Sequence, residues 1–247
     1  MHFFSEIPYS SSSDFQNQFL ETLKTYKLVL LSNVPEDIDR DEFYKALARH
    51  CGQFHQKSED DNTAKLIADK WLDISYNAKK GHTFRHSNTR QPLHIDGSYT
   101  DLKFDVIFFY CKEQAEIGGA TTFIDGPSVV DYLEKFDANL YSDLIKHDVA
   151  FEKGNNNYKI AKIIDIDSGK PKFNWNYYRV SKSNKPYIIE MSEKFHQFCE
   201  ERLVDGGLLK PIRLKPGEAI FFHDKLVLHG RNSFWGNRCL MKGAILL

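Results

Sequence analysis

The stretch QPLHIDGS, residues 91–98, is the most informative part of this sequence, because it places His94 and Asp96 two positions apart. Residues two apart on a β-strand point to the same face, so these two side chains can bind one metal ion. A further histidine, His229 in the segment LHGR at 228–231, follows much later in the chain. Two imidazoles and one carboxylate suit a non-haem Fe(II) centre with positions open for oxygen and a co-substrate. The three residues therefore predict a metal site and oxidative chemistry.

Short apolar runs separated by turn signals predict many short strands, at 27–31, 104–111, 120–124, 212–214, 219–222, 227–229 and 240–247. Apolar residues at helical spacing predict helices at about 14–24, 39–51, 129–136, 140–146 and 191–203, with Asp14 as the first N-cap. Many short strands with helices at the periphery favour a mainly β fold with a double-stranded β-helix (jelly-roll) core.

The 247 residues contain no internal repeat and no linker between compositionally distinct halves, so we expect a single domain over 1–247. The helices within 14–51 are expected to brace the β core. A polar loop is predicted over 154–157 as a cover. Hydrophobic residues make up 41% of the chain, with 19 Phe and 12 Tyr, which is enough for a sizeable core.

The net charge of −1 provides no basic field for nucleic acid or an anionic membrane, so we expect a small-molecule partner. The four cysteines are scattered, which is typical of thiols in a reducing compartment. No basic leader and no apolar run of membrane-spanning length is visible, so the predicted location is cytoplasmic. The sequence does not indicate an oligomeric state.

Five segments in this order resemble the TauD/TfdA-like (taurine dioxygenase-like) family of Fe(II)/2-oxoglutarate-dependent oxygenases: His94-Ile95-Asp96, GGAT at 118–121, PGEAIFF at 216–222, LHGR at 228–231, and Arg238 with Lys242 four residues later. The resemblance runs over most of the chain and implies a jelly-roll fold, iron as the metal, and 2-oxoglutarate and O2 as co-substrates.

The resemblance also implies a role for individual residues. His94, Asp96 and His229 would be the iron ligands, while Thr121 and Arg238 would hold the distal carboxylate of 2-oxoglutarate. A guanidinium suits that task because it offers a carboxylate two parallel, charge-assisted hydrogen bonds. Lys242 stands where a second arginine is common in the family. His223, in place of an aspartate, is the main rival to His229, which we prefer because the LHGR segment fits the motif.

The resemblance implies an enzyme, a dioxygenase that hydroxylates an unactivated C–H bond and releases succinate and CO2. It requires no catalytic side chain beyond the metal ligands, since the cofactor carries the chemistry. Five residues are candidates for substrate binding and together favour a small polar, carboxylate-bearing substrate such as an amino acid or a natural-product precursor: Arg231, Asn174, Arg90, Asn88 and Tyr177.

Three alternatives remain open at this point. The same cofactors could drive desaturation or cyclisation, and the chain could be a catalytically silent jelly-roll binding protein or a zinc hydrolase. The carboxylate of Asp96 disfavours halogenation, because related halogenases lack it.

Overall fold

The larger of the two main β-sheets contains the strands nearest both ends of the chain. The computed structural model describes residues 1–56, 58–59, 66–67, 71–154, 157–167 and 169–247. The strand order is β1 (His2–Pro8), β2 (Tyr26–Ser32), β16 (Ala219–His223), β8 (Val106–Glu113), β19 (Cys239–Leu246) and β3 (Gln53–Gln56), and β6 (Leu72–Ser75) also pairs with β19. β1 runs parallel to β2 and was not predicted from the sequence.

The smaller sheet has four strands, in the order β15 (Lys210–Ile212), β10 (Thr121–Asp125), β17 (Val227–Arg231) and β7 (Gln91–His94). All of its neighbouring strands are antiparallel. Side chains from both sheets share one buried cluster, which includes Phe109 and Phe222 from the larger sheet and Phe123 and Val227 from the smaller one. The two sheets therefore face each other across a common core, as a jelly roll requires.

Because side chains alternate along β8, this strand contributes residues to two buried clusters, one on each face of the sheet. Ile107 and Phe109 point to the cluster between the sheets, whereas Phe108 and Tyr110 belong to a second buried cluster on the outer face. This is the two-residue period of a β-strand with both faces covered. Phe108 stacks on Phe221 of β16, with ring centroids 4.7 Å apart.

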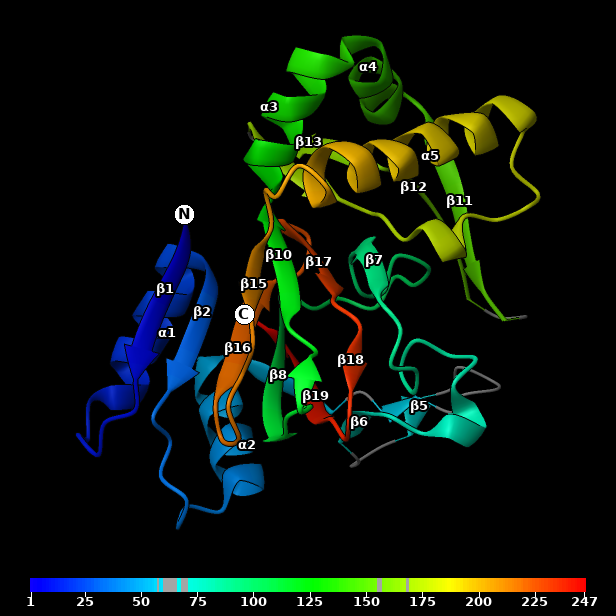
Figure 1. The fold of residues 1–247 in the computed structure, drawn as a ribbon. Coiled ribbons are helices and arrows are strands. Elements are labelled where there is room, and N and C mark those ends of the chain that lie inside the picture. Colours follow the sequence, from blue (N-terminus) through cyan, green and yellow to red (C-terminus); the bar gives the residue numbers. More distant parts are fainter. Residues whose placement is uncertain (57, 60–65, 68–70, 155–156, 168) are drawn as a thin grey trace.

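Helices α1 (Phe15–Thr25) and α2 (Arg40–Cys51) cover that outer face. Figure 1 shows both on the side of the molecule that holds β1 and β2. Asp39 caps α2, since its side chain accepts hydrogen bonds from the backbone N–H groups of Asp41 and Glu42. Asp14 is the N-cap residue of α1, as predicted, but its carboxylate accepts hydrogen bonds from the side-chain amides of Asn17 and Gln18 rather than from backbone N–H groups.

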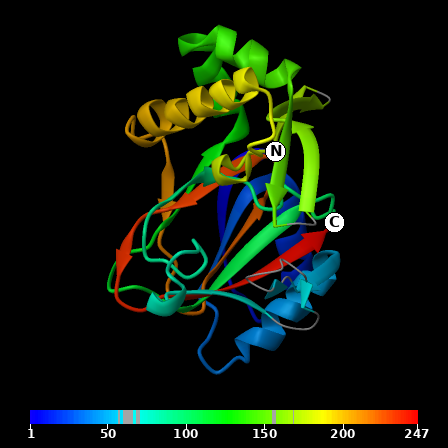
Figure 2. The ribbon, with the colours of Figure 1, turned by 90° about the vertical axis from the view of Figure 1, so that its right-hand side faces the viewer.

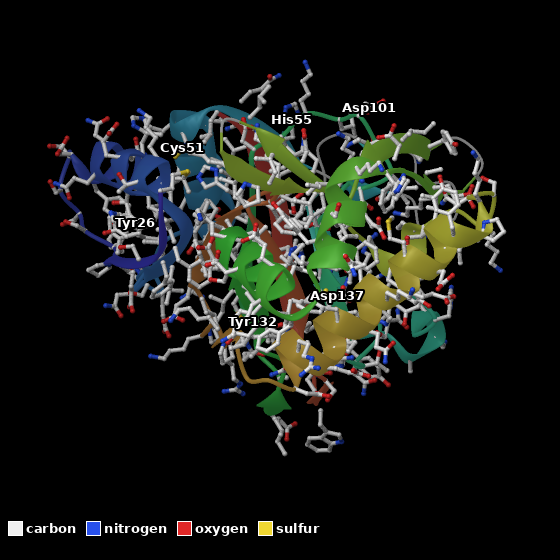
Figure 3. All side chains as sticks on the ribbon, turned by 90° about the horizontal axis from the view of Figure 1, so that it is seen from above. Tyr26, Cys51, His55, Asp101, Tyr132 and Asp137 are labelled. Atoms are coloured by element: carbon white, nitrogen blue, oxygen red, sulfur yellow. The ribbon has the colours of Figure 1, made fainter. Side chains whose placement is uncertain are left out.

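Three further helices cover one end of the sheets: α3 (Gly126–Phe136), α4 (Ala138–Lys146) and α5 (Pro186–Phe198), which continues as the π-helical turn η3 (Cys199–Val204). Figure 1 shows them above β10 and β17, and in Figure 3 Tyr132 of α3 and Asp137 before α4 lie over this end. They pack around the fully buried Trp175. α5 begins five residues earlier than predicted (191 − 186 = 5), with Pro186 in its first turn, where a missing N–H costs nothing.

The remaining elements are short. Two hairpins lie next to the helical end: β11 (Asp148–Lys153) with β12 (Asn157–Lys162), and β13 (Ile164–Asp167) with β14 (Lys170–Phe173). The other short elements are β4 (Ser58–Glu59), β5 (Leu66–Ile67), β9 (Ile117–Gly118), β18 (Phe234–Trp235), η1 (Ala78–Lys80) and η2 (Tyr177–Arg179). Of the loop predicted over 154–157, residues 155 and 156 lie outside the described residues. Among the residues described, no helix is long and apolar enough to cross a membrane.

Candidate functional site

The smaller sheet brings three predicted ligands together at one point. His94 ends β7 and stands directly opposite His229 of β17 in the antiparallel register, with ring centroids 4.2 Å apart. Asp96 follows in the turn after β7. The ligand atoms of His94, Asp96 and His229 all lie within 4.8 Å of one another. In Figure 2 the segment between β6 and β8, which carries two of these ligands, lies in front of the sheets.

Backbone contacts determine how Asp96 reaches this point. The N–H of Asp96 donates to Oδ1 of the fully buried Asp224, at 2.9 Å, and the preceding N–H of Ile95 donates to the carbonyl of Trp175. The next residue, Gly97, has φ of +69°, and a Cβ there would lie 2.9 Å from the ring of Phe104. Only glycine suits a turn that is both left-handed and this close to an aromatic ring.

The hydrogen bonds of the two histidines leave nitrogen lone pairs for a metal. Nδ1 of His94 lies 2.9 Å from the carbonyl oxygen of Pro92, so it donates its proton there and the lone pair lies on Nε2. Nε2 accepts a hydrogen bond from the side-chain amide of Gln91, at 3.1 Å, and a metal ion would take the place of that amide. Nε2 of His229 is 3.9 Å from Oδ2 of Asp96. Nδ1 of His229 is buried and has no hydrogen-bond partner among the described residues.

Burial and neighbouring charges keep the three groups in their ligand forms. Burial lowers the pKa of both His94 and His229. The pKa of His229 is lowered further because His94 lies beside it. Both imidazoles are therefore neutral at neutral pH. Burial alone would raise the pKa of Asp96, but the ammonium group of Lys242 holds it well below its ordinary value. Nζ of Lys242 lies 2.6 Å from Oδ2 of Asp96. Two neutral imidazoles and an ionised carboxylate therefore fit a divalent iron ion.

A second polar centre adjoins this one, where Thr121 begins β10 and Arg238 immediately precedes β19. Nε of Arg238 donates to the carbonyl of Gly119 at 3.1 Å, and its Nη2 lies 3.5 Å from Oγ1 of Thr121. Arg238 is only 4% exposed, and burial lowers its pKa to about 10, so it remains a cation at neutral pH. Among the described residues it forms no ion pair with a carboxylate, and a buried cation is costly without an anion. The site is therefore suited to a ligand carboxylate.

The turn Gly118-Gly119 makes room for this arginine. Both residues have positive φ, +74° and +73°, and a Cβ on Gly119 would lie 3.2 Å from Cδ of Arg238 and 3.0 Å from Oε1 of Gln114. The Gly-Gly pair of the sequence motif thus allows the backbone to pass close under the guanidinium.

We expect Gly119→Ala to weaken 2-oxoglutarate binding, because the new methyl group displaces the Arg238 side chain. Gly207→Ala is the matched control, since Gly207 has a similar φ of +71° but nothing within 4 Å of its Cβ position. Both variants should lose about 1–2 kcal/mol of stability through left-handed strain, measured by thermal unfolding. Calorimetric titration should show reduced affinity only in Gly119→Ala, and equal affinities in the two variants would contradict the assignment.

The metal and Arg238 centres open into one cavity of about 710 Å3. Its lining includes the three metal ligands, Thr121 and Arg238. Apolar side chains cover the walls near the metal site, among them Leu93, Phe104, Phe109 and Leu240. The arrangement places a candidate metal centre and a carboxylate site in the same cavity.

Two of the five predicted substrate residues line this cavity, Arg231 and Tyr177. The donors of Arg231 bind a neighbouring loop: Nη1 donates to the carbonyl of Phe84, and Nη2 donates to the carbonyl of Thr89 at 2.8 Å and to Oγ of Ser87. Tyr177 stacks on His196, with centroids 4.0 Å apart. Arg231 therefore ties the loop at 84–89 to β17, immediately beside His229.

The other three predicted substrate residues lie outside the cavity lining. Arg90 forms an ion pair with Glu200, and the carbonyl of Asn88 accepts a bond from the N–H of Phe234. Asn174 is buried, donates to the carbonyl of Ser98 at 3.0 Å, and accepts a bond from Nζ of Lys159 at 2.9 Å. Asn174 thus braces the loop that follows the metal ligands.

The structure separates His223 from the metal site. Its Nε2 lies 2.8 Å from the carbonyl of Leu23 in α1, on the outer face of the large sheet. Because His223 directly follows Phe222, which faces the inner core, the strand alternation turns it away from the site. The sequence motifs did not identify Asp224, which accepts a hydrogen bond from the N–H of Asp96. They also did not identify Tyr99, Lys153 and Arg179, which line the cavity, because no local pattern marks these residues.

A jelly-roll core that holds two histidines and one carboxylate, with open positions, is the architecture of a non-haem iron oxygenase. The chain belongs to the taurine catabolism dioxygenase TauD, TfdA family, whose sequence profile matches residues 4–245. The predicted family and the predicted mainly β fold are therefore confirmed.

Among curated proteins, the chain is 24% identical to the mitochondrial trimethyllysine dioxygenase of Rattus norvegicus, over 90% of this chain and 53% of the relative. The chain thus spans about half the length of that relative. PvcB of Pseudomonas aeruginosa has a similar fold, with a TM-score of 0.67, 17% identity and coverage of 99% and 86% of the two chains. Another PvcB structure describes it as an Fe, alpha-ketoglutarate dependent oxygenase from an isonitrile synthetic pathway. Asparagine oxygenase (AsnO) has a TM-score of 0.69, 13% identity and coverage of 94% and 76%.

Proposed function

We propose that this protein is an Fe(II)/2-oxoglutarate-dependent dioxygenase that hydroxylates an unactivated C–H bond of a small polar, carboxylate-bearing molecule, with release of succinate and CO2. One observation carries the proposal: the His94–Asp96–His229 cluster and the buried Arg238–Thr121 pair line the same cavity. The family to which the chain belongs supports it.

Each residue has a defined task in this reaction. His94, Asp96 and His229 would hold the iron on one side, and Arg238 with Thr121 would bind and orient the distal carboxylate of 2-oxoglutarate. Bound there, iron and 2-oxoglutarate supply the oxidising chemistry, in which O2 contributes one oxygen atom to succinate and one to the product alcohol. Apolar side chains such as Phe109 and Leu240 exclude water from the reacting atoms. Lys242 keeps Asp96 ionised.

The substrate class rests on the cavity and on the related proteins. Their names indicate amino-acid derivatives for two of them, asparagine for one and trimethyllysine for another. We propose an amino acid or a natural-product precursor for this chain. Tyr177 lines the cavity and can contact such a substrate, whereas Arg231 supports the wall through the loop at 84–89.

Anaerobic titration of Fe(II) and 2-oxoglutarate into metal-free protein tests the proposal. We expect the weak visible charge-transfer band of a chelated keto acid, followed by succinate release when air and a substrate-screening set of amino acids are added. A folded, iron-loaded protein without the band would overturn the oxygenase assignment. A band without any succinate would instead identify a silent binding protein, and an unsaturated or cyclised product would identify the same-cofactor alternatives.

A further inference from the structure

Two pairs of facing residues from β6 and β19 form part of the cavity lining. In the antiparallel register Ile74 stands opposite Leu240, and Leu72 stands opposite Lys242. Residues two apart on a strand share a face, and all four of these residues line the cavity. Met241, which lies between Leu240 and Lys242, belongs instead to the buried cluster on the outer face. One face of β6 and β19 therefore presents three apolar side chains and one cation to the cavity.

This face begins beside the metal ligand Asp96. Nζ of Lys242 lies 2.6 Å from Oδ2 of Asp96, and Leu240 shares the strand face of Lys242. The ring of Phe104 also lies near this ligand, because a Cβ on Gly97, the residue after Asp96, would lie 2.9 Å from it. Phe104 and Leu240 belong to one buried cluster, and both line the cavity. An apolar surface therefore adjoins the metal site.

Leu102 extends this apolar surface toward solvent. It lies two residues before Phe104, in the loop between β7 and β8, lines the cavity and is 46% exposed, whereas Phe104 is buried. We call Leu72, Ile74, Leu102, Phe104 and Leu240 the apolar wall. Removing apolar surface from water is favourable, so the exposed part of this wall is suited to an apolar group of a ligand.

The cavity has room for a substrate next to the co-substrate. Its volume of about 710 Å3 lies within the range of small-molecule sites, about 300–1,000 Å3. Arg238 and Thr121, which hold the co-substrate carboxylate in the proposed function, are separate from the apolar wall. A polar group placed against this wall would give up its hydrogen bonds to water beside side chains that cannot hydrogen-bond, which is costly. The wall therefore selects for an apolar group.

We infer that the apolar wall is a subsite for an aliphatic or aromatic arm of the substrate. The carboxylate-bearing molecule that the enzyme hydroxylates would then have an apolar arm, as an aliphatic amino acid does, rather than a carboxamide or a charged side chain. The inference rests on the proposed function in one respect, that the molecule held there is the substrate.

Binding of unbranched alcohols tests the apolar wall without requiring turnover. The probes are 1-butanol, 1-hexanol and the polar-ended 1,6-hexanediol, titrated by calorimetry into the 247-residue protein with saturating Zn(II) and 2-oxoglutarate. We expect 1-hexanol to bind about 15-fold more tightly than 1-butanol, because each buried methylene lowers the Kd about fourfold. The diol should bind at least about fivefold more weakly than 1-hexanol, because its second hydroxyl would be placed against the wall.

Substitutions at Leu102 assign this binding to the wall. Leu102→Gln should raise the Kd of 1-hexanol at least about fivefold. Leu247→Gln is the matched control, since Leu247 is also 46% exposed but lies outside the cavity lining, and it should change the Kd by less than about twofold. Leu102→Met guards against a local folding defect, because it keeps an apolar side chain of similar volume and should retain binding.

The outcomes separate this inference from the proposed function. The subsite would be overturned if 1-hexanol failed to bind, if the diol bound equally well, or if Leu102→Gln and Leu247→Gln had equal Kd values. A protein that shows the expected alcohol binding but no visible band with Fe(II) and 2-oxoglutarate would keep the subsite and lose the proposed function alone. A protein with the band but without alcohol binding would lose only the subsite.

Discussion

His229→Gln is expected to weaken Fe(II) binding by more than about 100-fold, because loss of an outer-shell partner alone typically costs 10–100-fold and this change removes a ligand. The remaining His94 and Asp96 would hold the ion through two groups only. Anaerobic titration with Fe(II), followed by calorimetry, measures the effect. Succinate formation should be lost in parallel.

His223→Gln is the control, because it makes the same chemical change at the histidine that the sequence offered as a rival. Glutamine can still donate to the carbonyl of Leu23, the group that His223 contacts. We expect unchanged Fe(II) affinity in this variant. The assignment of the third ligand would have to be abandoned if His223→Gln lost the metal and His229→Gln kept it.

The second large effect is expected for Arg238→Gln, which should raise the Kd of 2-oxoglutarate. Truncating one partner of a buried, hydrogen-bonded charge pair costs about 2–5 kcal/mol, a factor of about 30 to several thousand in Kd. Metal binding should persist, because Arg238 is not a ligand. Titration of 2-oxoglutarate into the Fe(II) form, followed by its visible band, measures the change.

Two further variants provide comparisons for Arg238→Gln. Arg238→Lys keeps the charge but loses the planar fork, so it should fall between the native protein and Arg238→Gln. Arg202→Gln removes an arginine that lies over the ring of Phe136, outside the cavity lining, and should leave the Kd unchanged. An unaltered Kd in Arg238→Gln would remove this arginine from the co-substrate site.

Much of the fold was predictable because strand and helix periods are local. The apolar runs at 104–111 and 219–222 correspond to β8 and β16, and the helical spacing at 129–136 and 140–146 corresponds to α3 and α4. β1 was not predicted, because its parallel pairing with β2 depends on a neighbour rather than on a pattern of its own.

The sequence by itself determined which residue types could form the site: a His-X-Asp pair, a distant histidine, a Gly-Gly turn and an arginine suited to a carboxylate. The expectation that His94 and Asp96 share one strand face was wrong, because β7 ends at His94 and Asp96 lies in the turn that follows. Only the tertiary structure placed His229, and not His223, beside His94 and Asp96, by strand alternation. Only it brought Lys242 to Asp96 and Arg231 to the loop at 84–89. It also brought Lys153 and Arg179 to Tyr99. The physical reason is that the alternation of side chains between the two faces depends only on the strand itself. Which residue a side chain contacts depends instead on the register and path of segments far away in the chain.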